Sequence, residues 1–464
     1  MPYIFGKYYP PRNIIFFLGE GLIIFLSLLG VSYFFEDISP GVFGPSSFIH
    51  HVMRVFVVTL IFQICFYYFE LYDLSNLPSI YDLTARSMQA FGFGFIILGI
   101  IYILAPSISI SSKVFFAAYA FVCLCIALWR WGYITILDKK FFTRPAVIVG
   151  TGRLASDIYN ELSTRKDAQY RVAAFFGPKV EGLFDVNIPI YEDKAYLFLV
   201  AKDVKAERII VALDDRRGKT PIRELLECRF KGIPVVQGIS FYEELTGKIL
   251  VERTNPAWLI FSDGFKKSKF TLFVKRCMDI VLSIVGLTIS SPLIVFSAII
   301  IILESKGPVF YRQDRVGLDE KVFKVIKFRS MVQDAEKDGK ARWASEDDPR
   351  VTHYGRIMRK YRIDEIPQMW NVLKGEMSFV GPRPERPQFV EILKEKIPYY
   401  ALRHSVKPGL TGWAQIFYPY GASEEDALKK LEYDLYYIKK LGFWMDLKII
   451  FDTGKIVLFK KGAR

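Results

Sequence analysis

Long hydrophobic runs dominate the N-terminal part of the chain. Four segments are long and apolar enough to cross roughly 30 Å of hydrocarbon, namely residues 14–35, 52–69, 88–104 and 114–134. The first of them carries one acid, Glu20, and lacks the polar face, repeating every 3.6 residues or so, that marks a helix packed in a soluble core. We therefore predict four transmembrane helices in residues 1–143, arranged as a bundle.

Positive charges mark the orientation of these segments. Lys7 and Arg12 precede the first one, Lys139, Lys140 and Arg144 follow the fourth, and the first outer loop has neither Lys nor Arg. Because cytoplasmic loops carry an excess of Lys and Arg, both flanks are expected in the cytoplasm. The chain beyond them then begins on that side of the membrane.

Residues 144–250 change to short apolar runs that alternate with amphipathic stretches. The run AVIVGTGRLASDIYNEL fits a buried strand, a glycine turn and a helix, with Gly150, Gly152 and Ala155 at the places of the G-x-G-x-x-G/A fingerprint. The runs RVAAFFGP, RIIVALDD and IPVVQG read as further strands. This alternation predicts a Rossmann-like parallel sheet covered on both faces.

The cofactor signal of this sheet domain is weak. Its second strand ends in Phe176, Gly177 and Pro178, where a dinucleotide site needs an acid for the ribose hydroxyls. Gly150 and Gly152 are thus candidates for holding a nucleotide or another regulatory ligand. We favour the alternative of a structural or oligomerising domain whose glycines serve only the tight turn.

A fifth apolar run, residues 277–303, is interrupted by Ser290, Ser291 and Pro292. Proline removes a helical hydrogen bond and clashes with the preceding turn, so a break is expected, with the serines satisfying the freed carbonyls. The run can form a kinked crossing helix or a helix that enters the membrane and turns back. We predict the second, a re-entrant hairpin over residues 274–304.

Charge decides between these two forms of the fifth run. A polar linker, residues 251–269, leads to it and ends in lysines suited to anionic headgroups. Basic residues stand on both sides of the run: Lys266, Lys267, Lys269, Lys275 and Arg276 before it, and Lys306, Arg312 and Arg315 after it. Both ends therefore carry the cytoplasmic signature.

Composition narrows the partners. The 464 residues include 62 Lys and Arg against 48 Asp and Glu, a net charge of +14, with 52% hydrophobic residues. A basic protein requires an anionic partner, and a chain this apolar favours lipid and phosphorylated substrates over nucleic acid. The five cysteines and four histidines have no spacing typical of a disulfide framework or a zinc site.

The C-terminal part is rich in polar stretches punctuated by glycine and proline, among them FKVIKFRSM, GPRPERP and LRHSVKPGLTGWAQ. Pro384 and neighbouring prolines fix backbone directions. Arg383, Arg403 and Lys407 supply the forks and point charges that match phosphate oxygens. We predict a phosphate-binding site here.

Two adjacent acids, Asp364 and Glu365, follow a run of cations in the same region. An aspartate beside a divalent cation and arginines stays ionised and can attack phosphorus, while the second carboxylate holds the metal or a proton. Mg²⁺ suits such a site because it takes one or two protein carboxylates plus substrate phosphates. The alternative is an acid pair stabilised by the start of a helix.

These stretches, in this order, resemble the bacterial sugar transferases known as monotopic phosphoglycosyl transferases. The resemblance covers about residues 270–459, and the preceding membrane and sheet regions resemble the large form of the family. It implies a mainly α catalytic domain, residues 270–464, that transfers a sugar 1-phosphate from a UDP-sugar to undecaprenyl phosphate and releases UMP. This would be the first membrane step of exopolysaccharide or O-antigen synthesis.

The resemblance also implies a location and partners. It places a multi-pass protein in the bacterial inner membrane, with a cytoplasmic catalytic domain against inner-leaflet phospholipids. Nucleic acid is not expected as a partner, and a homodimer is compatible with the large form. The sugar, the lipid length and the ligand of the sheet domain are left open.

Residue roles follow from the same resemblance. Asp364 corresponds to the covalent nucleophile and magnesium ligand, and Glu365 to its partner in metal binding or proton handling. The remaining correspondences are the helix break at Ser291 and Pro292, the basic residue Lys327 with Arg329 nearby, and the G-P-R-P turn of residues 381–384 with Arg383 on substrate phosphate. Together they imply a ping-pong reaction through an aspartyl-phosphosugar.

One stretch departs from the family. Many members continue GWAQ with Asn-Gly-Arg, whereas this chain continues IFYPYGASEEDA. The contact of the missing arginine has Tyr418, Tyr420 and Ser423 as candidate replacements. The C-terminal residues 435–461 mix aromatic residues with lysines, as in a helix at the membrane interface or a packed soluble helix.

Two rival functions use parts of the same sequence. An NAD-dependent nucleotide-sugar epimerase or reductase would rest on the glycine turn alone, and the missing ribose acid counts against it. A non-catalytic membrane scaffold or regulator of polysaccharide assembly would carry a degenerate transferase module, and the intact acid pair, Lys327 and G-P-R-P turn count against it.

Overall fold

The computed structural model describes residues 3–4, 7–35, 45–75, 79–106, 110, 112–138, 143–178, 188–192, 196–214, 220–254, 256–332, 350–418, 421 and 423–458. The chain divides into two compact units. The first contains residues 9–238, and the second contains residues 3–8 and 239–464.

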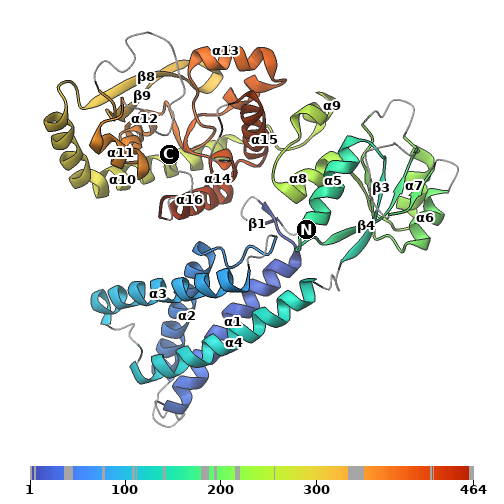
Figure 1. Ribbon diagram of the computed structural model, residues 1–464, viewed down its shortest axis with the longest axis horizontal. Coiled ribbons are helices and arrows are strands. Elements are labelled where there is room, and N and C mark those ends of the chain that lie inside the picture. Colours follow the sequence, from blue (N-terminus) through green and yellow to red (C-terminus); the bar gives the residue numbers. More distant parts are fainter. Residues whose placement is uncertain are drawn as a thin grey trace. The chain divides into compact units, whose positions relative to one another are not determined.

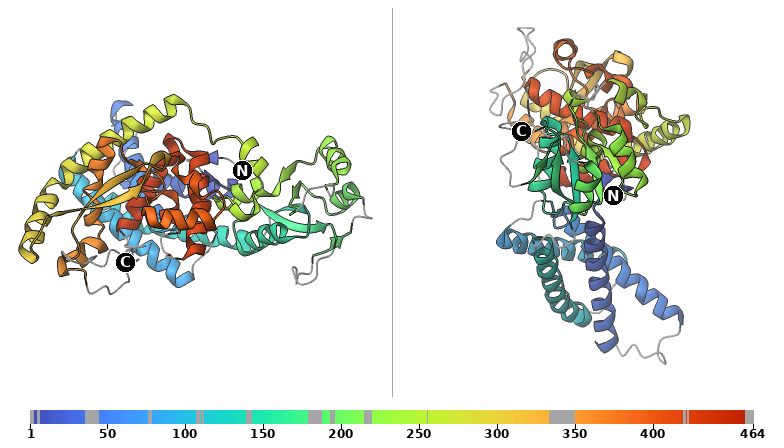
Figure 2. Two further views of the ribbon diagram at one scale, coloured as in Figure 1. Left: turned by 90° about the horizontal axis from the view of Figure 1, so that it is seen from above. Right: turned by 90° about the vertical axis from the view of Figure 1, so that its right-hand side faces the viewer.

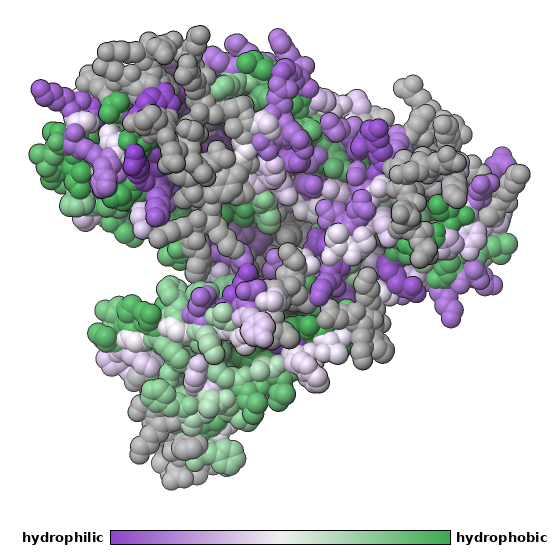
Figure 3. Space-filling model, in the orientation of Figure 1, coloured by the Kyte–Doolittle hydropathy of each residue, from purple (hydrophilic) through white to green (hydrophobic). Residues whose placement is uncertain are grey.

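The first unit begins with long apolar helices (Figure 1), which are α1 (Pro11–Phe35), α2 (Pro45–Tyr68), α3 (Ile80–Leu104) and α4 (Ser112–Asp138). All four are long and apolar enough to cross a membrane. Helix α1 packs on α2 and α4, and α2 packs on α3, around a hydrophobic cluster that includes Ile24, Val58, Leu98 and Val122. Hydrophobic side chains also cover much of their outer surface in Figure 3. The predicted membrane segments are confirmed as apolar helices.

The acid noted in the first segment is paired inside these helices. Glu20 is fully buried, and its carboxylate accepts a 2.5 Å hydrogen bond from Nε of Arg130 on α4. The same guanidinium donates to the Ser87 hydroxyl of α3, 3.2 Å away. Because an isolated charge in an apolar interior is costly, the pair explains how α1 tolerates Glu20.

A five-stranded parallel sheet completes the first unit, and its strand order is β5-β4-β3-β6-β7. Its elements are β3 (Arg144–Val149), α5 (Arg153–Thr164), β4 (Tyr170–Phe176), β5 (Ile190–Tyr191), α6 (Leu197–Asp203), β6 (Arg208–Val211), α7 (Ile222–Phe230) and β7 (Val235–Gln237). The first strand of this sheet in the sequence, β3, lies in the centre, with β4 and β5 on one side and β6 and β7 on the other. The chain therefore changes direction across the sheet at β3, as in a Rossmann fold. The predicted Rossmann-like sheet is present.

The second unit is mainly helical (Figure 2). Its first elements are β1 (Tyr3–Ile4), β2 (Lys7–Tyr8), α8 (Gly238–Thr246), η2 (Val251–Arg253), α9 (Pro256–Phe261), α10 (Lys269–Glu304), β8 (Phe310–Val316), η3 (Leu318–Glu320) and β9 (Val322–Phe328). They are followed by α11 (His353–Lys360), η4 (Ile363–Glu365), α12 (Gln368–Lys374), β10 (Ser378–Val380), α13 (Pro387–Lys396), η5 (Tyr400–Ser405), β11 (Gly409–Thr411), α14 (Trp413–Phe417), α15 (Glu424–Lys440) and α16 (Phe443–Leu458). Strands β8 and β9 form an antiparallel hairpin, and β10 pairs in parallel with β11.

Residues 239–254 and 256–269 belong to the second unit and pack within it, whereas the sequence predicted a sheet domain up to residue 250 and a polar linker over residues 251–269. The carbonyl of Gly247 accepts a 2.8 Å hydrogen bond from the Trp413 indole, and the amide of Ile249 donates to the Glu432 carbonyl. Val251 is almost fully buried. The buried residues of this stretch are scattered among charged ones, so its composition predicted an exposed polar linker.

Helix α10 is a single 36-residue helix that continues through Pro292, and it bends along its length in Figure 2. The Ser291 hydroxyl donates to the Thr288 carbonyl at 2.8 Å, which is the acceptor that Pro292 leaves without an N–H donor. Ser290 donates in the same way to Gly286. The expected interruption is therefore a bend within one helix, in which Ser291 satisfies the freed carbonyl as predicted, whereas the Gly286 carbonyl bound by Ser290 is not one that Pro292 frees.

Candidate functional site

The acid pair lies in η4, a short 3₁₀ turn between α11 and α12. Arg362, immediately before it, has φ of 54°, a left-handed conformation that is unfavourable for a side chain with a Cβ. Asp364 and Glu365 are only 9% and 8% exposed. Strained backbone and buried acids are typical of functional sites rather than of a surface helix start.

Glu365 is bound by cations from three directions. Its Oε1 accepts a 2.7 Å hydrogen bond from Arg383 and a 3.1 Å hydrogen bond from Lys327, and its Oε2 lies 3.8 Å from Arg362. Burial by itself would raise the pKa of Glu365, but attraction to these cations outweighs burial and holds the pKa well below its usual range. Glu365 is therefore ionised.

Asp364 differs from its neighbour. Within the part of the chain that the structure describes, its carboxylate accepts no hydrogen bond. Burial first, and then repulsion from ionised Glu365, raises the pKa of Asp364 to about 6, against the attraction of Lys327, Arg359 and Arg383. One acid is thus occupied by cations, while the other has lone pairs available to an electrophile or a metal.

Lys327 is placed by strand β9, and that strand is held by α12. The Asn371 side chain accepts from the Ile326 amide at 3.0 Å and donates to the Lys324 carbonyl at 2.8 Å. These bonds fix the backbone of β9 immediately before Lys327. Burial lowers the pKa of Lys327, with Glu365 opposing the shift. Sequence reasoning missed Asn371, although its place shortly after the acid pair could have suggested it.

The turn that carries Arg383 requires glycine because two backbones meet there. The Gly381 amide donates to the Thr411 carbonyl at 2.8 Å, and the Gly409 amide donates to the Pro382 carbonyl at 2.9 Å. A Cβ on Gly409 would lie 2.0 Å from the Gly381 nitrogen. The G-P-R-P and P-G-L-T-G stretches are therefore one structural feature, which positions Arg383.

Not all predicted phosphate-binding residues face the acids. The Pro384 carbonyl accepts a 3.0 Å bond from Arg315, a cation that sequence reasoning did not select. Arg403 is buried behind the turn and donates to the Arg383 carbonyl at 3.0 Å. Lys407 lies beside Arg276, because both approach the Cβ position of Gly375.

Arg329 has a different environment from the one expected. Its guanidinium donates to the carbonyls of Lys306 and Ser305, each at 2.7 Å, and to Ile301 at 3.4 Å. These are carbonyls at the C-terminal end of α10, where a helix leaves acceptors unpaired. Arg329 thus caps α10, whereas Asp364, Glu365, Lys327 and Arg383 come together.

Residues 270–460 match the family described as bacterial sugar transferase. A Bacillus subtilis relative is 51% identical over 138 residues, which are 30% of this chain and 76% of that protein. The chain belongs to the bacterial sugar transferase family. The match begins at α10 and includes every element that forms the acid site.

Two longer relatives of this sugar transferase carry specific names. UDP-N-acetylgalactosamine-undecaprenyl-phosphate N-acetylgalactosaminephosphotransferase of Aeromonas hydrophila is 42% identical over 251 residues, 54% of this chain and 58% of that protein. Undecaprenyl-phosphate glucose phosphotransferase of Komagataeibacter xylinus is 33% identical over 356 residues, 75% of this chain and 65% of that protein. The chain thus spans less than two thirds of the length of these curated relatives.

The glycine turn of this sugar transferase's sheet domain holds an internal carboxylate. Asp214, after β6, accepts hydrogen bonds from the amides of Arg153 at 2.8 Å and Leu154 at 3.1 Å, at the start of α5. A Cβ on Gly152 would lie 2.1 Å from that carboxylate, and a Cβ on Gly150 would lie 2.3 Å from the carbonyl of Ala212, the residue after β6. In a Rossmann site these amides bind a cofactor phosphate.

The residues that were candidates for the missing arginine contact also have partners. The Tyr418 hydroxyl donates to Asp426 at 2.6 Å, and Ser423 caps α15 through a reciprocal capping box with Asp426. Tyr420 lies outside the described residues. Tyr418 and Ser423 thus serve the start of α15 in this structure.

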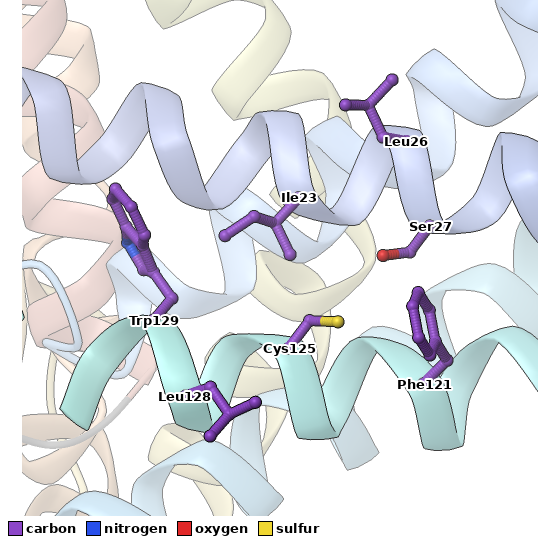
Figure 4. A pocket seen from close by; sticks show the side chains of 7 residues that line it. All are labelled: Ile23, Leu26, Ser27, Phe121, Cys125, Leu128 and Trp129. Atoms are coloured by element: carbon purple, nitrogen blue, oxygen red, sulfur yellow. The ribbon is translucent and has the colours of Figure 1, made fainter. Parts of the chain in front are cut away.

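A shallow groove between α1 and α4 contains none of the acid-site residues. Ile23, Leu26, Leu128 and Trp129 are among the side chains that line it, and Ser27 supplies its hydroxyl (Figure 4). Its apolar lining suits the hydrocarbon around membrane helices rather than a polar substrate.

Proposed function

We propose that the chain transfers a sugar 1-phosphate from a UDP-sugar to undecaprenyl phosphate and releases UMP. The observation that carries the proposal is the difference between the two buried acids. Glu365 is neutralised by Arg383 and Lys327, whereas Asp364 has no hydrogen-bond donor among the described residues. That arrangement suits a nucleophilic carboxylate beside a fixed anion that holds the cations in place.

The reaction proceeds in two displacements. An Asp364 oxygen attacks the β-phosphorus, the bond from that phosphorus to the oxygen bridging it to the α-phosphorus breaks, and UMP leaves with the bond's electrons. An oxygen of undecaprenyl phosphate then attacks the same phosphorus and frees the carboxylate. Arg383 and Lys327, which bind Glu365 next to Asp364, would attract the phosphate oxygens whose charge develops in both steps.

Mg²⁺ fits the donors that the chain offers. Asp364 presents hard oxygen ligands, and Mg²⁺ in phosphoryl-transfer sites takes one or two carboxylates together with substrate phosphates and water. The described residues contain no group of three or more His, Cys, Asp or Glu that could hold a metal alone, which agrees with a site completed by substrate. When bound, the ion would neutralise phosphate charge, with Asp364 as its protein ligand. Glu365, the second ligand that the family resemblance implies, is held by Arg383 and Lys327 in this structure and would have to share its carboxylate with the ion.

Contacts of α10 support a re-entrant rather than a crossing helix. Near its start, Lys275 donates to the Val380 carbonyl at 2.8 Å, and near its end the hydroxyls of Ser297 and Tyr354 are 2.8 Å apart. Because both ends bind the same second unit, we place them on one side, the cytoplasmic side of a bacterial inner membrane.

The membrane position brings the two substrates together. UDP-sugars are water-soluble, whereas undecaprenyl phosphate keeps its chain in the bilayer and its head at the interface, beside inner-leaflet phospholipids. The named relatives act on different sugars, N-acetylgalactosamine and glucose. The proposal therefore extends to the class of UDP-sugars and not to one sugar, and a homodimer is compatible with it.

Mass spectrometry of the trapped adduct tests this proposal. Purified protein in nanodiscs is mixed with UDP-sugars and Mg²⁺ without acceptor, digested and analysed for a phosphosugar ester on the peptide that contains Asp364. We expect the ester there, UMP released in step with it, and neither in Asp364→Asn. Adding undecaprenyl phosphate should clear the ester. An active preparation whose adduct lies on another residue, or that forms none, contradicts the proposal.

The hydrogen bonds of Asp214 to the start of α5 count against the alternative function of an NAD-dependent epimerase. A dinucleotide would need the α5 amides that Asp214 already occupies. The scaffold alternative predicts that UMP release stays at background in the wild type, so the same assay separates it from the transferase.

A further inference from the structure

One face of α15 fixes the backbone turn that carries Arg383. Asp434 and Tyr437 stand three residues apart on this helix, so they point to the same side, and both are almost fully buried. Asp434 is linked through Arg403 to the end of the turn, at Arg383. Tyr437 lies at the start of the turn, where its hydroxyl contacts the Val380 carbonyl.

At Arg383 the connection passes through Arg403. One guanidinium nitrogen of Arg403 lies 2.9 Å from the Asp434 carboxylate and also donates to the Arg383 carbonyl at 3.0 Å. The other donates to the Tyr400 hydroxyl at 2.5 Å. Arg403 is thus held by two side chains while it holds the Arg383 backbone, and its planar fork leaves little freedom for that carbonyl to rotate.

At Val380 the carbonyl accepts from Lys275 at 2.8 Å. The Lys275 ammonium also binds the Tyr437 hydroxyl at 3.1 Å and the Asp446 carboxylate at 2.7 Å. The turn therefore has a buried polar anchor at each end. Residues between two such anchors have few conformations available, so the direction of the Arg383 side chain is set by the anchors.

This direction matters because the Arg383 guanidinium must reach Glu365 at 2.7 Å. We infer that Asp434 is a positioning residue: through Arg403 it fixes the Arg383 backbone, so that Arg383 binds Glu365 and leaves Asp364 available to the donor. The inference rests on the proposed transferase function and deepens it. Asp434 itself touches none of the reacting atoms.

A double-mutant cycle tests the route from Asp434 to Arg383. Single-turnover UMP release is measured at saturating UDP-sugar for the wild type, Asp434→Asn, Arg383→Lys and the double variant, in nanodiscs with Mg²⁺. Asp434→Asn should slow release about 10- to 100-fold with little change in donor KM, because a misplaced group of this kind costs about that factor. In the Arg383→Lys background the same change should cost much less.

A second buried ion pair on α15 supplies the matched control. The Lys439 ammonium lies 2.7 Å from Glu243, and both side chains are nearly as buried as Asp434 and Arg403. This pair joins α15 to α8 and does not contact the turn that carries Arg383. Glu243→Gln should lower the unfolding temperature much as Asp434→Asn does. It should leave the single-turnover rate within about twofold of the wild type, because a loss of stability at a site that does not contact the turn leaves the turn in place.

Several outcomes overturn the inference. It is wrong if Asp434→Asn slows release no more than Glu243→Gln, or if the Asp434 and Arg383 effects multiply. Should Asp434→Asn not fold, Arg403→Lys decides, because one ammonium cannot reproduce the fork; a wild-type rate in that variant contradicts the inference. If the wild type releases UMP and Asp364→Asn does not, the proposed function stands whichever result the cycle gives. If the wild type is inactive, both fall.

Discussion

Replacing Arg329 tests whether this residue has a structural role or binds substrate, because in the structure it binds carbonyls at the end of α10 and not the acid pair. Replacing it by Met removes two 2.7 Å hydrogen bonds to the carbonyls of Lys306 and Ser305 at the end of α10. Hydrogen bonds from a charged donor contribute about 1.5–3 kcal/mol each, so the loss is about 3–6 kcal/mol. For a unit of this size that is on the order of 10 °C in unfolding temperature.

The assay compares Arg329→Met with Arg383→Met in nanodiscs, by thermal unfolding and by UMP release from the folded protein. Arg329→Met should unfold earlier and keep the donor KM. Arg383→Met should show the smaller change in unfolding temperature and the larger loss of rate, because its side chain is 42% exposed and contacts Glu365. An unchanged unfolding temperature in Arg329→Met, together with a raised donor KM, would refute the capping role.

Three further changes test the packing of the second unit. Lys275→Met leaves the fully buried Asp446 without its cation and should cost about 3–5 kcal/mol in unfolding free energy; adding Asp446→Leu should restore most of it, as measured by denaturant unfolding. Gly409→Ala places a Cβ 2.0 Å from a backbone nitrogen and should cost about 3 kcal/mol or more by the same measurement. Burial raises the pKa of Glu432 from 4.5 to about 7, against the attraction of Lys248. The folded state therefore binds this proton more tightly, so stability falls as pH rises from about 4.5 to 7; Glu432→Gln should flatten that part of the pH–Tm curve.

The membrane helices could be predicted from sequence because hydrocarbon selects composition directly. Their C-terminal ends agree closely with hydropathy, but α2 and α3 begin at Pro45 and Ile80, well before the apolar runs that start at residues 52 and 88. Hydropathy detects the part of a helix that suits lipid, whereas backbone hydrogen bonding continues through the polar residues that precede it.

The acid pair was a candidate from sequence because two adjacent acids follow a run of cations, and the family resemblance implied its role. Its burial became visible only in the structure. The roles of the surrounding cations could not be predicted. Arg329, Arg383 and Arg403 have the same side-chain chemistry, yet one caps a helix, one binds Glu365 and one holds a backbone carbonyl. Which of these an arginine does depends on the acceptor that the fold brings to it.

The glycine turn of the sheet domain makes close contacts within the fold. Its glycines permit the close approach of β3 to the end of β6, and Asp214 supplies the negative charge that the start of α5 attracts. An acid on the neighbouring strand was visible in the sequence as the end of RIIVALDD, and it is the signal that could have predicted an occupied turn. Because the anion is covalently part of the domain, its local concentration far exceeds that of a free nucleotide phosphate. A cofactor would have to displace Asp214 and also bind without a ribose acid at the end of β4. Both departures from the dinucleotide pattern agree with the structural role that we predict for this domain.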